Sequence, residues 1–181
     1  VVPLLGVIAL AFAAMLAARV NKQEPGTDRM KEIAAAISEG AQAFLTAEYK
    51  ILLIFVVVLF VLIGVGIGNW VTAICFVVGA LFSTLAGYFG MSVATRANVR
   101  TANAAKQSGM NKALSIAFSG GAVMGMCVAG LGVLGVSAIY LITGNVDVLS
   151  GFSLGASSIA LFARVGGGIY TCLLYTSDAA D

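Results

Sequence analysis

The chain has 181 residues, of which 60% are hydrophobic and 10% are charged, and its mean hydropathy is +1.03. A soluble domain carries about 25% charged residues, so this composition excludes an ordinary soluble protein and indicates a membrane protein. The net charge is only +2, there is no histidine and the three cysteines are dispersed, which argues against a nucleic-acid partner and against a zinc or haem site.

Five apolar runs follow one another along the chain, and each is about long enough to cross a bilayer as a helix. They cover residues 1–18, 51–68, 71–93, 113–142 and 151–170. None alternates with the period of two that a membrane β-barrel requires. We therefore expect an all-α polytopic membrane protein with five transmembrane helices, at about residues 1–18, 28–67, 71–96, 112–142 and 150–171. The first run begins at Val1 without a methionine and lacks the basic segment of a signal peptide, so we expect a chain that is cut at its N-terminus.

A single helix is predicted from Asp28 to about Ile67. Pro25 and Gly26 break the chain before it, and Thr27 or Asp28 can cap its first turn. At 1.5 Å per residue this helix is about 60 Å long, roughly twice the thickness of the hydrocarbon core. We expect its first half to project from the membrane and to pack its apolar face, which includes Ile33, Ile37 and Phe44, against other protein; the alternative is a helix lying on the membrane surface.

Positive charge is confined to alternate connections between the runs. The first and third connections hold Arg19, Lys22, Arg29, Lys31, Lys50, Arg96, Arg100, Lys106 and Lys112. The second and fourth connections, residues 68–70 and 143–150, hold none. The positive-inside rule places the basic connections in the cytoplasm and Trp70 at the outer membrane boundary.

Small residues recur every fourth position in three of the runs, a spacing that lets membrane helices approach closely. They are Gly79, Ser83 and Gly87 in the third run, Gly121 and Gly125 in the fourth, and Gly151 and Gly155 in the fifth. Glycine is also simply common in membrane helices. The repetition over three runs favours a tightly packed bundle.

The fifth run contains one charged side chain, Arg164. Ionisable residues inside membrane spans usually mark an ion or substrate path. Gly166, Gly167 and Gly168 follow it and leave room for a close approach of backbone or ligand. The alternative is a structural arginine that reaches toward the membrane surface. The other four runs contain no nucleophile–base pair and no paired carboxylates, and we interpret them as scaffold.

Long segments of the chain resemble the membrane-bound, ion-pumping inorganic pyrophosphatases. They are MKEIA at 30–34, ISEGAQAFL at 37–45, AGYFGMSVATRANVRTA at 86–102, AFSGGAVMG at 117–125 and GASSIALFARVGGGIYT at 155–171. The resemblance runs from about residue 1 to residue 171, so it covers most of the chain. The motifs are long, which makes the resemblance specific.

The resemblance implies a homodimeric enzyme with about sixteen helices per subunit, which hydrolyses pyrophosphate at the cytoplasmic side and pumps protons or sodium ions outward. It implies Mg²⁺ as a cofactor and, in many members, K⁺. The first four helices resemble outer-ring helices, and the fifth resembles an inner-ring helix. Arg164 matches the family arginine of the ion-conducting region, where it would pair with an acidic residue on another inner helix that this chain does not contain.

The resemblance stops after Thr171. The family continues there with a phosphate-binding lysine and with aspartates that hold magnesium and substrate, whereas this chain has Cys172, Tyr175 and Ala179 at those positions. Asp178 and Asp181 are acidic but out of register. We therefore expect residues 172–181 to be a foreign tail, no intact catalytic or metal-binding residue, and no catalysis by this polypeptide alone.

Two further hypotheses stay open beside an N-terminal fragment of such a pump. One is a non-enzymatic multi-pass channel or complex subunit that uses Arg164 electrostatically, and the other is a purely structural bundle. The sequence leaves open whether the pumped ion is a proton or sodium, whether K⁺ is required, and whether five helices fold stably without their partners.

Overall fold

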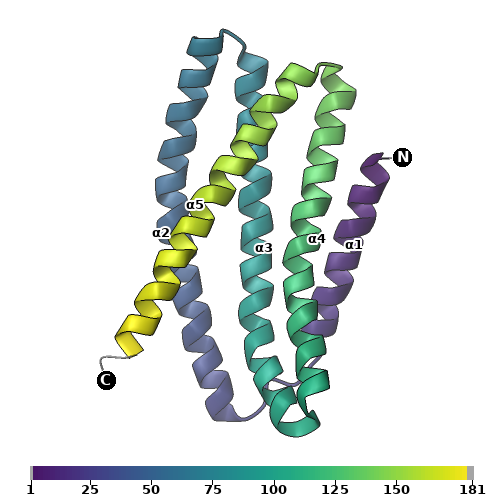
Figure 1. Cartoon of the computed structure of the whole chain (residues 1–181), viewed down its shortest axis with the longest axis vertical. Coiled ribbons are helices and arrows are strands. Elements are labelled where there is room, and N and C mark those ends of the chain that lie inside the picture. The colour runs from purple at the N-terminus through teal and green to yellow at the C-terminus, as the bar shows by residue number, and fades with distance from the viewer. Residues whose placement is uncertain (1, 179–181) are drawn as a thin grey trace. The chain divides into compact units, whose positions relative to one another are not determined.

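The computed structural model describes residues 2–178, with the side chains of 170, 171 and 173–178 left out of the description. This part of the chain consists of five long α-helices joined by short turns (Figure 1). The helices are α1 (Val2–Asn21), α2 (Asp28–Ile67), α3 (Trp70–Ser108), α4 (Met110–Thr143) and α5 (Val146–Asp178). The fold is therefore all-α with five candidate membrane helices, as the composition predicts.

Each of the four connections contains one glycine with a positive φ angle. These are Gly26 at 90°, Gly68 at 68°, Gly109 at 83° and Gly144 at 62°. The left-handed region costs a side chain about 1–2 kcal/mol but is open to glycine, so Gly68, Gly109 and Gly144 directly follow the last residues of α2, α3 and α4. The ends of the helices are thus set by backbone conformation rather than by loss of apolar character.

The expected helix ends need correction at α3 and α5. The sequence predicted that the third helix ends near residue 96, but α3 continues to Ser108. Residues 97–107 are rich in alanine and contain no helix breaker before Gly109, so nothing stops the helix when the apolar run ends. The fifth helix begins at Val146 rather than at 150, where the Asn145 side chain accepts a hydrogen bond from the amide of Asp147 at 2.9 Å.

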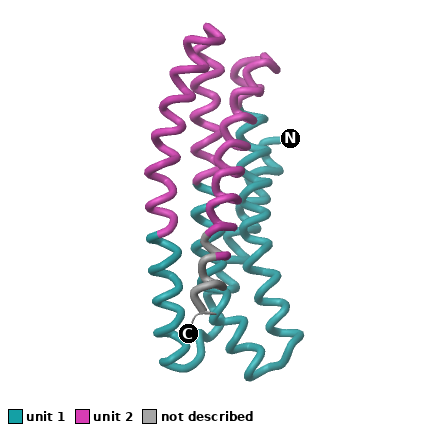
Figure 2. Tube along the Cα trace, turned by 60° about the vertical axis from the view of Figure 1, so that its left-hand side comes forward, with its two compact units in different colours: residues 1–43, 85–138 teal, residues 44–84, 139–181 magenta. Residues whose placement is uncertain are grey.

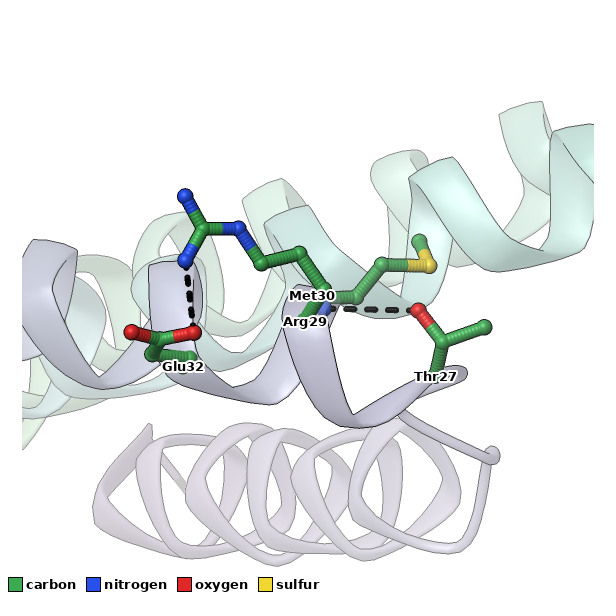
Figure 3. Close-up of polar contacts among 4 residues, drawn as sticks. All are labelled: Thr27, Arg29, Met30 and Glu32. Atoms are coloured by element: carbon green, nitrogen blue, oxygen red, sulfur yellow. Dashed lines mark hydrogen bonds and ion pairs between the residues drawn. The ribbon is translucent and has the colours of Figure 1, made fainter.

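The start of α2 shows which of the two candidate residues caps it. The Thr27 hydroxyl oxygen accepts a hydrogen bond from the amide of Met30 at 3.4 Å, which places Thr27 at the N-cap (Figure 3). Arg29 pairs with Glu32 at 2.7 Å on the exposed face of the same turn (Figure 3). The hydrogen bond and charge of Lys31 lower the pKa of Asp28, which therefore stays ionised at the positive end of the helix.

The chain divides into two compact units, each coloured separately in Figure 2. Unit 1 contains residues 1–43 and 85–138, and unit 2 contains residues 44–84 and 139–181. Helices α2, α3 and α4 contribute to both units, while α1 lies wholly in unit 1 and α5 wholly in unit 2.

Unit 1 is built around contacts of α4 with α1 and α3. Gly6 of α1 and Gly130 of α4 face each other, since a Cβ at Gly130 would lie 3.1 Å from the Gly6 carbonyl oxygen. The main apolar cluster comprises Ala13, Leu16, Ala86, Val93, Val123 and Cys127. Small residues at the crossing points therefore let the helices of this unit approach closely.

The α1–α2 connection of unit 1 is held by two side chains of α3. The Arg100 guanidinium donates to the Gln23 carbonyl oxygen at 3.0 Å and to that of Asn21 at 3.5 Å. The buried Asn103 amide donates to the Glu24 carbonyl oxygen at 3.1 Å. These bonds satisfy carbonyls at and beyond the end of α1 that have no partner within the helix.

Unit 2 packs α2, α3 and α5 together. Leu52, Ala80 and Ile159, one from each helix, form one cluster, and Ile63, Ala73 and Phe76 form another. Aromatic contacts add to this packing: the Phe55 and Phe162 rings lie 4.6 Å apart, and Trp70 lies 5.8 Å from Phe60. Offset aromatic pairs of this kind contribute about 0.5–1.5 kcal/mol beyond their burial.

All five helices are long and apolar enough to cross a membrane, and large hydrophobic side chains cover much of their outer surface. On α2, residues 51, 53, 54, 57 and 58 are all exposed apolar side chains, as a lipid-facing helix requires. Ile33 and Ile37 of the first half of α2 are also exposed, at 50% and 44%. Their packing against other protein stays a prediction.

Candidate functional site

Helix α5 is seated on α3 through glycines on one face. A Cβ at Gly155 would overlap the backbone carbonyl of Phe76, and a Cβ at Gly151 would overlap that of Thr72. Gly79 of α3 faces α5 in the same way, because its Cβ would overlap the Phe152 carbonyl. Spacing of small residues by four along both helices thus brings their backbones together, as membrane-helix packing motifs do.

Arg164 lies on the opposite side of α5 from this packed face. The buried residues of the helix are Val148, Gly151, Phe152, Gly155 and Ile159. At about 100° per residue, their mean direction is about 180° away from Arg164. Arg164 is exposed, and no carboxylate among residues 2–169 lies within ion-pair distance of it.

Two serines share the face of α5 that carries Arg164. Ser153 and Ser157 are exposed and lie within about 20° of Arg164 around the helix axis. Neither serine was among the predicted site residues, although separations of eleven and seven residues from Arg164 place both on its face of a helix. A polar stripe inside an apolar helix needs protein or water opposite it, because lipid cannot satisfy these groups.

The glycines that follow Arg164 differ from one another. A Cβ at Gly166 would come within 3.0 Å of the Glu48 carboxylate and 3.5 Å of the Phe44 ring, so α2 approaches α5 closely here. A Cβ at Gly167 or Gly168 would meet no heavy atom within 4 Å. An added side chain would therefore clash at Gly166, whereas the packing role of Gly167 and Gly168 stays a prediction.

Glu48 of α2 is a half-buried carboxylate that the sequence did not predict as a site residue. Its Oε1 atom is buried and has no hydrogen-bond partner in the described part of the chain. Glu48 lies four residues before the buried Leu52, on the same face of α2, but the sequence carries no signal of this burial because residues 51–58 are apolar on every face of the helix. A buried polar atom without a partner is costly and calls for an occupant or a neighbouring group.

The remaining residues that were predicted to pack helices together are Ser83, Gly87, Gly121 and Gly125. Ser83 and Gly87 are half-buried in α3. Gly121 and Gly125 of α4 are exposed, and an added Cβ would meet nothing within 4 Å at either position. Their role in helix packing stays a prediction.

The described residues do not fit a magnesium site. Among the side chains that the structure describes, those of residues 2–169 and 172, no three His, Cys, Asp or Glu lie close enough together to hold a metal ion. Mg²⁺ requires oxygen ligands in near-octahedral geometry, usually from carboxylates and phosphates. Of the three tail positions compared with the family pattern, Cys172 is exposed, the side chain of Tyr175 is not described and Ala179 lies outside the described residues.

The chain is similar to known membrane pumps over almost its whole length. The family model of the inorganic H⁺ pyrophosphatase matches residues 7–174. A protein of Clostridium tetani named as a K⁺-stimulated pyrophosphate-energized sodium pump is 60% identical over 169 residues, which is 93% of this chain and 25% of that protein. A K⁺-insensitive pyrophosphate-energized proton pump of Methanosarcina mazei is 48% identical over 93% of this chain and 25% of its own length.

A K⁺-stimulated pyrophosphate-energized sodium pump of Thermotoga maritima is 41% identical, over 93% of this chain and 26% of its own length. The chain therefore spans about a quarter of the length of the curated relatives it matches. Since the family model covers nearly all of its residues, the chain belongs to the inorganic H⁺ pyrophosphatase family.

Proposed function

We propose that this chain is the N-terminal part of a pump that couples pyrophosphate hydrolysis to the movement of protons or sodium ions across a membrane. The observation that carries the proposal is the family match over residues 7–174. The relatives include both proton and sodium pumps, so the proposal names the energy source and leaves the ion as either of the two.

In this proposal α1 to α4 are scaffold and α5 carries the functional face. The glycine contacts of α5 with α3 fix its orientation, which turns Arg164, Ser153 and Ser157 away from the scaffold. The partner of Arg164 is an acidic residue in the remainder of the pump. A guanidinium beside such a carboxylate favours its ionised form and so sets how readily it holds a proton or sodium ion.

The proposed cofactors and partners belong to the whole pump. Mg²⁺ neutralises pyrophosphate when bound, and K⁺ stimulates some members; the residues that hold them lie outside this chain. The match ends at residue 174, and we propose that the last residues of the chain are not pump sequence. We also propose that the pump is a homodimer in a bacterial-type cell membrane. Cross-linking of the whole pump in its membrane tests the dimer.

We expect no magnesium-dependent pyrophosphate hydrolysis by membranes that contain this chain alone. The physical reason is that the described residues supply no cluster of carboxylates and no metal site. The measurement is phosphate release from pyrophosphate with and without Mg²⁺. The control is the same chain with residues 172–181 replaced by the genomic sequence that follows Thr171, continued to its end.

Two results would contradict the proposal. Turnover that rises with the amount of the 181-residue chain would show that the chain carries its own catalytic residues. A genomic locus with an intact stop codon directly after Asp181 would show that the gene encodes no larger pump.

We also propose that the first and third connections face the cytoplasm, because they hold all the connection lysines and arginines. A cysteine introduced at the exposed Gln107 is then expected to react with a membrane-impermeant thiol reagent only from the cytoplasmic side. A cysteine at Asp147 in the opposite set of connections is the control and is expected to react only from outside. The reverse pattern would overturn the orientation.

A further inference from the structure

We propose that unit 1 binds the phosphate headgroup of an anionic phospholipid between the ends of α1, α3 and α4. Nothing in the pump function proposed above requires this site. The inference rests on two adjoining cavities and on the charges and apolar surface around them.

The first cavity lies between α1 and α4 and has a volume of about 240 Å³. Arg19 and Lys112 supply two positive charges to its wall, and Ser115 and Ser119 add hydroxyl groups. No acidic residue lines it. Cationic and hydroxyl donors without a competing carboxylate form a suitable environment for a phosphate group.

The second cavity, of about 300 Å³, adjoins the first because Gln23, Lys112 and Ile116 line both. It adds the cations Lys22 and Arg100, and one acidic residue, Glu24. The two cavities together thus present four cationic side chains against one carboxylate. Lys112 lies between them and can reach a ligand in either.

Arg19, Lys22 and Lys112 are available to a ligand, whereas Arg100 already donates to the carbonyls of Gln23 and Asn21. In the described part of the chain, the ion pairs are Arg29–Glu32 and Lys31–Asp28, and neither Arg19, Lys22 nor Lys112 takes part. Lys112 is also in the first turn of α4, where the positive end of the helix dipole adds to the attraction for an anion.

The position of the cavity along the helices favours a lipid over a free anion. Arg19 directly follows the apolar run 1–18, and Lys112 directly precedes the run 113–142, so both lie where a membrane span ends. Basic pockets between membrane helices at this level are typical sites for anionic headgroups. A site for a soluble anion would not need to lie at the level where the membrane spans end.

A row of exposed apolar side chains on α1 leads away from Arg19. Met15, Phe12 and Ile8 lie four, seven and eleven residues before it, on the same helix face, and their exposed fractions are 62%, 43% and 56%. This row lies where the acyl chains of a lipid held at Arg19 would run. The face of α1 that carries Arg19 thus offers a cation to the headgroup and apolar side chains to the acyl chains.

The test measures the dissociation constant for the first phosphatidylglycerol bound to the 181-residue chain, by native mass spectrometry from a zwitterionic detergent. The double variant Arg19→Gln/Lys112→Gln is expected to bind about tenfold or more weakly, since each basic residue near a membrane surface contributes about 1 kcal/mol. The double variant Lys50→Gln/Lys106→Gln removes the same charge outside both cavities and is expected to bind within about twofold of the wild type.

Further arms separate the possible outcomes. Arg19→Lys/Lys112→Arg conserves charge and is expected to retain binding, and wild-type binding is expected to weaken with salt, which tests the site even if the glutamine variant fails to fold. Equal losses in both glutamine variants would reveal only non-specific surface charge and overturn the proposal. Phosphatidylcholine binding as tight as phosphatidylglycerol, or equally tight binding of inorganic phosphate alone, would overturn it too.

Discussion

Gly155→Leu is expected to separate α5 from α3 and to destabilise unit 2 by about 2 kcal/mol or more. A Cβ at this position would overlap the Phe76 carbonyl and would lie 3.0 Å from the Ala80 amide nitrogen. Both obstacles are backbone atoms of α3, so no rotamer change relieves the clash and the helices must move apart. Overpacking of a core costs about 1–3 kcal/mol, and more where the backbone has to shift.

The chain contains its own reporter for this experiment. Trp70 is the only tryptophan, and in unit 2 it packs against Phe60 and Gly64. Its fluorescence during titration with a denaturing detergent measures the free energy of unfolding. Gly66→Leu is the matched control, since Gly66 belongs to the same unit and an added Cβ there meets nothing within 4 Å. Equal midpoints for wild type and Gly155→Leu would show that the two backbones are not in the contact described.

The glycine pattern shows what the sequence can and cannot predict about helix packing. Spacing by four identified Gly79, Gly151 and Gly155, and backbone contacts stand behind all three. The same spacing identified Gly121 and Gly125, which face open space. Periodicity places residues on one helix face, but it carries no information on whether another helix meets that face.

The helix count followed directly from composition, because a bilayer needs about 20 apolar residues per crossing. The end of α3 did not, because apolar character and helical conformation stop at different points. The apolar run ends near residue 93, whereas the backbone stays helical to Ser108 and stops before the positive-φ Gly109. Glycine position was the better signal for helix ends in this chain.

At the candidate site, the sequence predicted the charge but not its surroundings. Arg164 was evident as the only ionisable side chain of its run. Glu48 was not predicted as a site residue, because the sequence does not show which face of this helix meets α5. Its burial arises from the approach of Gly166 on α5, a contact between residues more than one hundred positions apart.

In the whole pump that we propose, Arg164→Ala is expected to lower ion transport per pyrophosphate hydrolysed by about tenfold or more. Arg164 lies on the side of α5 opposite its packed face and has no acidic partner in the described residues, and our proposal gives it a carboxylate partner in the rest of the pump. Removing one member of a buried charge pair costs about 3–5 kcal/mol, because the other charge is left unpaired.

Arg164→Lys distinguishes the charge from the shape of the guanidinium. It keeps the positive charge but loses the planar fork of donors, so partial retention of transport is expected if a carboxylate is held in bidentate fashion. Lys106→Ala, an exposed residue of α3, controls for general charge loss. The measurement is the ratio of ions moved into sealed vesicles to pyrophosphate consumed. If Arg164→Ala leaves both this ratio and the hydrolysis rate unchanged, the arginine is structural and the ion path lies elsewhere.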